Sequence, residues 1–194
     1  MGRTSDARER LLDAAQALMH QRGYAAIGVA EICARADVRK GSFYHFFASK
    51  EALSIAAIDA YWAAQRPAWL AARDGDADPV ARLEAVVRAQ VDAQHAYKAA
   101  TGNLDGCLLA NLGIELSDRE PLVRNRIQEI FDEQIGIVTD IVTQIGVPDP
   151  VDAARSVLAQ LEGAVLFAKL RNDPMLLDGL WDQTRRLIGV QANA

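Results

Sequence analysis

Cysteine is scarce in this chain, with Cys33 and Cys107 the only two among 194 residues. Their spacing matches no metal-ligand motif and they are too few for a disulfide scaffold, so we expect a reducing cytoplasmic environment. Long hydrophobic runs are also lacking. No segment approaches the roughly 18 uncharged apolar residues that span a bilayer. The first apolar stretch, residues 11–19, is interrupted by Asp13 and Gln16 and so is not typical of a signal peptide. The sequence predicts a soluble protein with no membrane partner.

Motifs of catalysis are missing too. The stretch at residues 102–106 contains glycines but is not followed by the lysine that a Walker-type nucleotide loop needs. The three histidines, His20, His45 and His95, are scattered and form no carboxylate pattern for a metal ion. We therefore expect no enzyme activity, no metal ion and no cofactor. A helical enzyme and a helical adaptor that binds only proteins stay open as alternatives from other classes.

Basic residues are outnumbered overall, but not in the N-terminal quarter. The formal net charge is −5, which argues against a protein that coats nucleic acid through bulk positive charge. Residues 1–50, however, carry eight Lys and Arg against five Asp and Glu, whereas the remainder carries 13 against 21. This asymmetry suits a small anion-binding module joined to an acidic body, although a solvated surface with no partner could show it too.

Hydrophobic residues make up 51% of the chain, enough to bury a core. They recur at spacings of three and four with no sustained alternation, which predicts an all-α protein of about nine helices. Asp6 with Glu9 resembles a capping box at the first helix, and Pro67 predicts a kink or break near Gln65. The expected helices cover about residues 6–22, 29–35, 39–45, 49–73, 79–97, 107–116, 121–145, 151–170 and 174–190.

The second and third expected helices are separated by only the three residues 36–38. Two helices of seven residues are marginal alone, so packing against the first helix has to hold them. The inner face that would do so consists of Val29, Ile32, Val38, Phe43, Phe46 and Phe47. The outer face of residues 39–45 offers cations and hydroxyls, which can meet phosphates and base edges in a major groove. Residues 29–47 are therefore predicted to form a DNA-binding helix-turn-helix.

At these residues the sequence resembles the TetR family of transcriptional regulators, of the TetR/AcrR type. The resemblance rests on GY at 23–24, VAEI at 29–32, KGSFYHFF at 40–47 and SKEAL at 49–53. It implies a DNA-binding domain at residues 1–48 and a helical effector-binding and dimerisation domain at residues 49–194. The function it implies is a ligand-responsive repressor that binds a palindromic DNA operator as a homodimer and is released by a small-molecule effector.

Three positions depart from the family pattern. Gly28 replaces a common threonine that caps the second helix and touches phosphate. Asp37 occupies the usual glycine of the turn, and aspartate tolerates the left-handed backbone better than most residues. Arg39 replaces a typical serine at the start of the recognition helix, where it adds a cation and a potential bidentate reader of guanine. We expect operator specificity to differ from the family pattern here.

The resemblance and the residue chemistry together nominate DNA contacts. Tyr44 and Lys50 are expected on phosphates, and Arg3 and Thr4 as an N-terminal arm. The groove-facing residues are expected to be Arg39, Lys40, Ser42 and His45. The alternative for Tyr44 and His45 is that they pack at the edge of the helical bundle.

A single helix-turn-helix reads too few base pairs for useful specificity, so the body is expected to supply a dimer face. The residues expected there are Val157, Leu161, Ala164 and Ala168 on one helix and Leu177, Leu180, Trp181, Thr184 and Ile188 on the next. An ordinary intrachain core is the alternative for this set.

An effector pocket is expected in the body, mainly from the resemblance. Its candidate lining residues are Trp62, Trp69, His95, Cys107, Asn111, Phe131 and Phe167. Bound ligand would shift the helix that starts at Ser49 and so change the separation of the two recognition helices. As an alternative, Cys107 could make the protein a sensor of electrophiles or oxidants, because a thiol at a helix N-terminus is more readily ionised. A buried structural cysteine is the competing interpretation.

Overall fold

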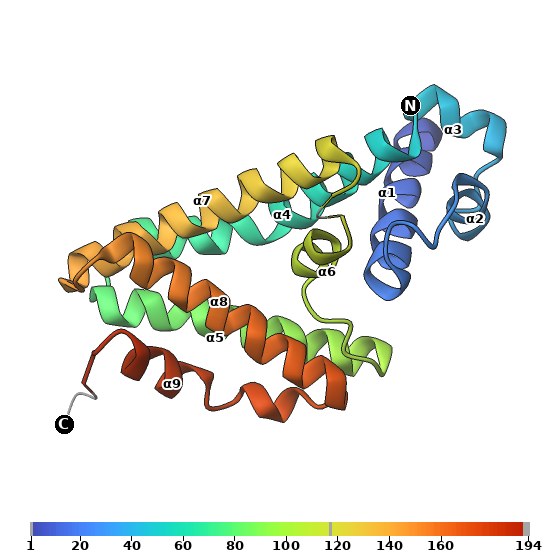
Figure 1. The fold of residues 1–194 in the computed structure, drawn as a ribbon. Helices are drawn as coiled ribbons and strands as arrows, with labels where there is room; N and C mark the ends of the chain where they lie inside the picture. Colours follow the sequence, from blue (N-terminus) through green and yellow to red (C-terminus); the bar gives the residue numbers. More distant parts are fainter. Residues whose placement is uncertain (1, 117, 192–194) are drawn as a thin grey trace. The chain divides into compact units, whose positions relative to one another are not determined.

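The computed structural model describes residues 2–116 and 118–191, with side chains from residue 6 onward. Within these ranges the chain folds into nine α-helices and one short 3-10 helix, η1, which confirms the all-α prediction (Figure 1). None of the helices described is long and apolar enough to cross a membrane. The elements are α1 (Gly2–Arg22), α2 (Val29–Arg35), α3 (Lys40–Phe46), α4 (Lys50–Asp74), α5 (Pro79–Thr101), α6 (Leu108–Glu115), α7 (Pro121–Ile145), α8 (Pro150–Arg171), η1 (Pro174–Leu177) and α9 (Leu180–Leu187).

Two of the helices have the expected bounds at both ends, whereas α5 ends at Thr101, beyond the expected Tyr97. Helix α2 begins and ends where the sequence predicts, and α7 begins at Pro121 and ends at Ile145, as expected. The capping box at the first helix is wrong, because α1 already begins at Gly2. Asp6 therefore lies inside the helix, where its carboxylate is 3.7 Å from the guanidinium of Arg10 one turn later.

The structure differs from two expectations about helix interruption, because the break allowed for at Pro67 is absent and the last expected helix is divided. Helix α4 runs through Pro67 without a break, although a proline removes a backbone donor and crowds the preceding turn. Trp62 and Trp69, on either side of Pro67, are both buried, so packing holds the helix before and after it. The single helix expected from Pro174 is instead divided into η1 and α9, with Gly179 as the N-cap of α9. Glycine is a poor residue for a helix interior.

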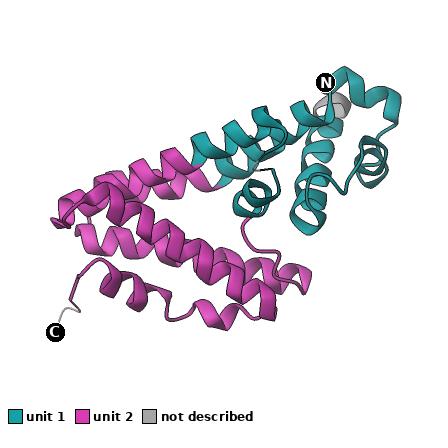
Figure 2. Ribbon diagram, in the orientation of Figure 1, with its two compact units in different colours: residues 1–64, 108–130 teal, residues 65–107, 131–194 magenta. Residues whose placement is uncertain are grey.

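The chain forms two compact units that do not follow its sequence order (Figure 2). One unit combines residues 1–64 with residues 108–130, so it contains α1 to α3, the first part of α4, α6 and the first part of α7. The other combines residues 65–107 with the chain from residue 131 onward. The boundary expected near residue 48 therefore stays a prediction about function and does not coincide with a boundary of packing.

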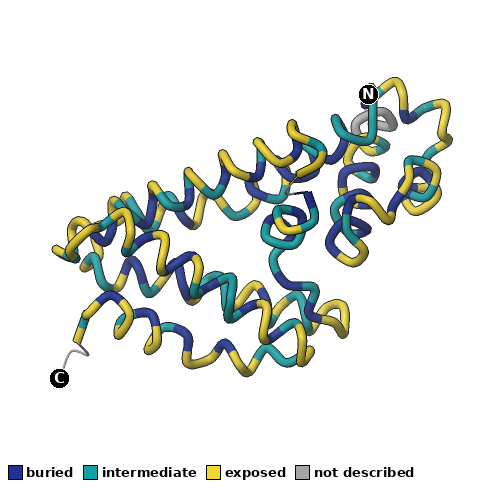
Figure 3. Tube along the Cα trace, in the orientation of Figure 1, coloured by how far each residue is buried: buried dark blue, intermediate teal, exposed yellow. Residues whose placement is uncertain are grey.

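The first unit has an apolar core that holds the two short helices in place (Figure 3). Leu11 and Met19 of α1, Ile32 of α2 and Phe43 of α3 are fully shielded from solvent. Each large apolar side chain buried in this way stabilises the fold by about 1.5–3 kcal/mol. This burial supplies the stability that two isolated seven-residue helices lack.

Candidate nucleic-acid interface

The turn between α2 and α3 has the backbone conformation that the sequence suggested. Asp37 has a φ of +50°, in the left-handed region that aspartate tolerates. The turn is closed by the N–H of Val38, which donates to the carbonyl oxygen of Cys33 at 2.9 Å. Arg10 on α1 lies beside it, with its guanidinium 3.6 Å from the Asp37 carboxylate. This pairing has no local sequence signal, and it offsets the acidic charge that replaces glycine in the turn.

Helix α3 presents a polar face of solvent-exposed side chains. Arg39 at its N-cap and Lys40 in its first turn are exposed, as is His45, while Ser42 is half-buried. Nothing lies within 4 Å of the space that a side chain at Gly41 would occupy. Two cations, a hydroxyl and an imidazole are thus accessible around Gly41, an arrangement that is suitable for entering a DNA groove.

Tyr44 combines both of the interpretations that the sequence allowed. Its ring contacts that of Phe43 edge-on, with 5.1 Å between the ring centroids. The residue is nevertheless 57% exposed. The ring therefore packs at the edge of the unit while leaving much of the residue accessible, so a phosphate contact stays a prediction for Tyr44.

Lys50 makes contacts inside the unit that the sequence did not reveal. Its ammonium donates hydrogen bonds to the carbonyl oxygens of Tyr24 at 3.0 Å and Ile27 at 3.1 Å. The same ammonium lies 3.8 Å from the centre of the Tyr24 ring. Lys50 therefore ties the start of α4 to the connection between α1 and α2, and its contact with phosphate stays a prediction.

The remaining DNA expectations concern the N-terminus of α1 and of α2. Arg3 and Thr4 lie outside the residues whose side chains are described. Gly28 is the N-cap of α2 and supplies no side-chain cap, as its sequence implies. The space beside it is open to 4 Å, so the absence of a capping hydroxyl is a property of the residue and not of crowding.

The residues expected to line an effector pocket lie in very different environments. Trp62 and Trp69 are buried. Intermediate exposure is shared by His95, Cys107, Asn111 and Phe131. The Nε2 atom of His95 is 2.9 Å from the carboxylate of Asp178. Phe167 is 64% exposed on α8, so it lies on the surface of this chain and the prediction that it lines a pocket is wrong.

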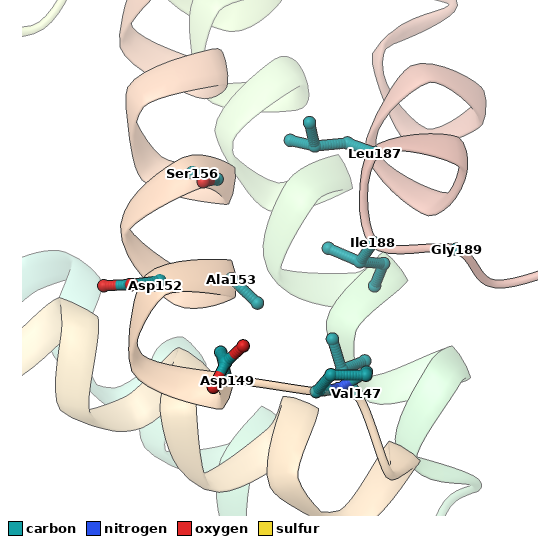
Figure 4. A pocket seen from close by; sticks show the side chains of 9 residues that line it. Val147, Asp149, Asp152, Ala153, Ser156, Leu187, Ile188 and Gly189 are labelled. Carbon is teal, nitrogen blue, oxygen red and sulfur yellow. The ribbon is translucent and has the colours of Figure 1, made fainter.

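Two surface hollows lie apart from that set. One, of about 420 Å³, lies where the start of α8 meets the end of α9 (Figure 4). Asp149 and Asp152 line one side of it, and Leu187 and Ile188 the other. The second, of about 320 Å³, is formed by α1 and the end of α2 around Arg10 and Arg35. Neither hollow is lined by a residue that the sequence nominated for an effector.

The residues expected at a dimer face mostly point into the chain. Seven of the nine are buried, and the other two, Ala164 and Trp181, are half-buried. The buried ones are Val157, Leu161, Ala168, Leu177, Leu180, Thr184 and Ile188. They build the core of α8, η1 and α9, which is the intrachain alternative that the sequence left open. The exposed apolar residues of α8 and η1 are different ones, namely Val151, Leu166, Phe167, Leu170, Met175 and Leu176.

Glu162 on α8 is an acid that was not among the predicted site residues. Its Oε2 atom is shielded from solvent and has no hydrogen-bond partner in the described part of the chain. Burial raises the pKa of this carboxyl, and a hydrogen bond with Cys107 opposes the shift. The Glu162 carboxyl therefore stays protonated up to a higher pH in the folded protein than in the unfolded chain.

This shift predicts a pH-dependent effect of Glu162→Gln. As pH rises past about 4.3, the unfolded chain releases the proton first, so the wild type loses stability up to the raised pKa. Glutamine does not titrate. The variant should therefore melt close to the wild type near pH 4 and at a higher temperature near pH 7, measured by circular dichroism. Glu9→Gln, on an exposed part of α1, is the control. A gap that is equal at both pH values would contradict the assignment.

The fold and the exposed basic face of α3 together define a helix-turn-helix regulator of transcription. Residues 11–57 match the family described as bacterial regulatory proteins, tetR family. Residues 79–183 match the C-terminal domain of LmrA/YxaF-like transcriptional regulators. The chain belongs to the TetR family, whose members are ligand-responsive repressors that bind DNA as dimers.

Individual relatives agree with this assignment over most of the chain. The transcriptional repressor DhaR of Mycobacterium sp. (strain GP1) is 30% identical, covering 88% of this chain and 86% of its own. The regulator AcuR of Cereibacter sphaeroides is 32% identical, covering 87% and 80% respectively. The crystal structure of reduced Escherichia coli NemR aligns with a TM-score of 0.82 at 26% identity, covering 97% of this chain and 100% of that one. The sequence resemblance to the family is thus confirmed.

Proposed function

We propose that this repressor inserts α3 of each of two protomers into successive major grooves of an inverted-repeat operator. The observation that carries the proposal is the exposure of Arg39, Lys40 and His45 on α3, a helix whose Phe43 side chain is fully buried. Burial of Phe43 fixes the helix to the unit, so the polar face has a defined direction. Cations on such a face can neutralise phosphates and can also donate to the acceptor atoms of guanine.

We also propose that α8 supplies the dimer face through its exposed apolar side. Leu166 and Leu170 are exposed, and their spacing of four residues keeps them on one side of the helix. Phe167 adds an aromatic ring next to them, and Met175 on η1 extends the patch. Contiguous exposed apolar surface of this kind typically marks an interface with another chain. The buried residues of the same helix are then free to hold α9 in place.

The effector is proposed to bind among the polar and aromatic residues of the second unit. Trp69, His95, Cys107 and Phe131 belong to that unit and combine apolar surface with a few polar atoms, as ligand sites do. Induction would require the effector to bind the DNA-free protein more favourably than the DNA-bound protein by only about 1–3 kcal/mol. The alternatives of a Cys107 thiol sensor, an enzyme and an adaptor are not favoured by the homologues, which are repressors and other regulators.

Selection of bound sequences from random DNA tests the proposal. We expect enrichment of an inverted repeat whose half-site centres are about 34–36 Å apart, or a multiple of this, because the two recognition helices must reach the same side of the duplex. The enriched duplex is then used to screen small molecules for release. Failure to enrich any sequence, or enrichment of a single unrepeated half-site, would contradict a dimeric repressor of this kind.

A further inference from the structure

The connection between α1 and α2 is held by a carboxylate from a distant part of the chain. Glu115 is the last residue of α6. Its Oε2 atom accepts the backbone N–H of Tyr24 at 2.8 Å, and its Oε1 atom accepts the backbone N–H of Ala25 at 2.7 Å. All three residues belong to the same compact unit. Both oxygens of one side chain are therefore engaged by two consecutive peptide groups.

Gly23 makes this close approach possible. Its φ of +82° is in the left-handed region, where a side chain is strained. A Cβ atom added to Gly23 would also collide with Oε2 of Glu115. Glycine at position 23 thus serves two purposes. It allows the backbone turn at the end of α1, and it leaves room for the Glu115 carboxylate.

The opposite side of the connection is held from α4. Lys50 donates to the carbonyl oxygens of Tyr24 and Ile27, so the N–H groups are held by α6 and the carbonyl groups by α4. Tyr24 itself is buried. Burial and the Glu120 carboxylate, which accepts its hydroxyl hydrogen bond, raise the pKa of Tyr24 far above its ordinary value. The Glu115 carboxylate and the Lys50 ammonium therefore hold the connection between α1 and α2 from two sides.

We propose that Glu115 is a positioning residue for DNA binding, which fixes the connection that sets the direction of α2 and α3. Helix α2 begins at Val29, only four residues after Ala25. Hydrogen bonds from backbone N–H groups to a carboxylate are roughly twice as strong as neutral ones. Without Glu115, the part-buried N–H of Tyr24 loses its acceptor, the exposed N–H of Ala25 is left to water, and of these bonds the connection keeps only those to Lys50 on the other side. The proposal rests on the proposed function, since DNA affinity is one of its measures.

The sign of the charge effect separates positioning from simple electrostatics. Glu115→Gln removes one negative charge from a DNA-binding unit, and so does Asp118→Asn, at an exposed residue three positions later. On electrostatic grounds alone, both changes should strengthen binding to the polyanion or leave it unaltered. Glu115→Gln keeps one acceptor oxygen but places an NH2 group against the second N–H. If Glu115 positions the connection, its variant weakens binding while the control does not.

The experiment measures operator affinity together with the amide resonances of Tyr24 and Ala25 in the full-length protein. In Glu115→Gln and Glu115→Ala we expect both amide protons to move upfield as the charged acceptor is lost. Operator affinity should fall about tenfold or more, the factor that corresponds to roughly 1.4 kcal/mol. Asp118→Asn should change neither measurement in this direction. Gly23→Ala, which displaces the carboxylate from the other side, should reproduce the loss.

Two outcomes would overturn the proposal, and each has a distinct meaning. If the amide protons shift but both Glu115 variants bind the operator as tightly as Asp118→Asn does, the carboxylate is structural and does not position the helices. If the amide protons do not shift, the hydrogen bonds are absent in solution. A wild-type protein that enriches no operator would instead overturn the proposed function, and the amide shifts would still report whether Glu115 holds the connection.

Discussion

Arg39→Ala should weaken operator binding by about 30-fold to 10⁴-fold. A bidentate contact between arginine and guanine contributes about 1–3 kcal/mol of discrimination, and a dimer makes the contact twice. The doubled range, about 2–6 kcal/mol, converts to that change in dissociation constant. Arg39 is exposed at the N-cap of α3 and makes no side-chain capping bond there, so its loss should leave the helix intact. Affinity is measured by fluorescence anisotropy on the selected operator.

The kind of contact follows from how the loss depends on sequence and salt. If Arg39 reads a base, Arg39→Ala should relax specificity at one position of each half-site. If it binds phosphate, affinity should fall equally for all sequences and the salt dependence should become shallower by about one unit per contact. Arg88→Ala is the matched control, since Arg88 is an exposed arginine on α5 that pairs with Glu84. Equal affinities for the Arg39 and Arg88 variants would remove Arg39 from the interface.

Phe167→Glu should convert the dimer into a folded monomer. The residue is 64% exposed in the single chain, so a glutamate there should not disturb the chain's own core. In the proposed dimer the same carboxylate would be buried against apolar surface with no counter-charge, which costs several kcal/mol. A monomer has only one recognition helix. Operator affinity should therefore also fall by about 10²-fold to 10⁴-fold, the usual gain from linking two binding sites.

Sedimentation velocity at micromolar concentration measures the expected change of mass, and thermal melting checks the fold. Ile114→Glu is the control, because Ile114 is 76% exposed on α6 and lies outside the proposed face. Leu161→Glu should behave differently from both, since Leu161 is buried in the chain and a charge there should unfold it. A Phe167→Glu protein that sediments as a dimer would exclude this side of α8 as the interface.

Residues close together in the chain account for most of what could be predicted. The bounds of α2 and the conformation of Asp37 follow from spacing and turn chemistry within about ten residues. The absence of a break at Pro67 shows where such local rules end. Proline disfavours a helix interior, but two buried tryptophans nearby outweigh that preference.

The sequence predicted the exposed residues of the candidate DNA interface, but it did not reveal the residues that hold the backbone behind them. Arg39 and Lys40 are exposed at the start of α3, as the sequence predicted, and Phe43 is buried as predicted. Arg10 beside Asp37 and Glu115 beside Tyr24 could not be found, because neither pairing has a local sequence signal. Glu115 is 91 residues from Tyr24, so only packing brings the carboxylate to the connection.

By itself the sequence determined the helical class, the helix-turn-helix and the family, because periodicity and turn chemistry act over neighbouring residues. The tertiary structure alone decided which side of α8 is covered. This helix carries apolar residues on more than one side, so its pattern is compatible with either Leu161 or Phe167 facing the solvent. Packing with η1 and α9 buried the first and left the second exposed. In the same way, only the fold turned the ammonium of Lys50 toward two carbonyl groups of a connection that lies some 25 residues earlier.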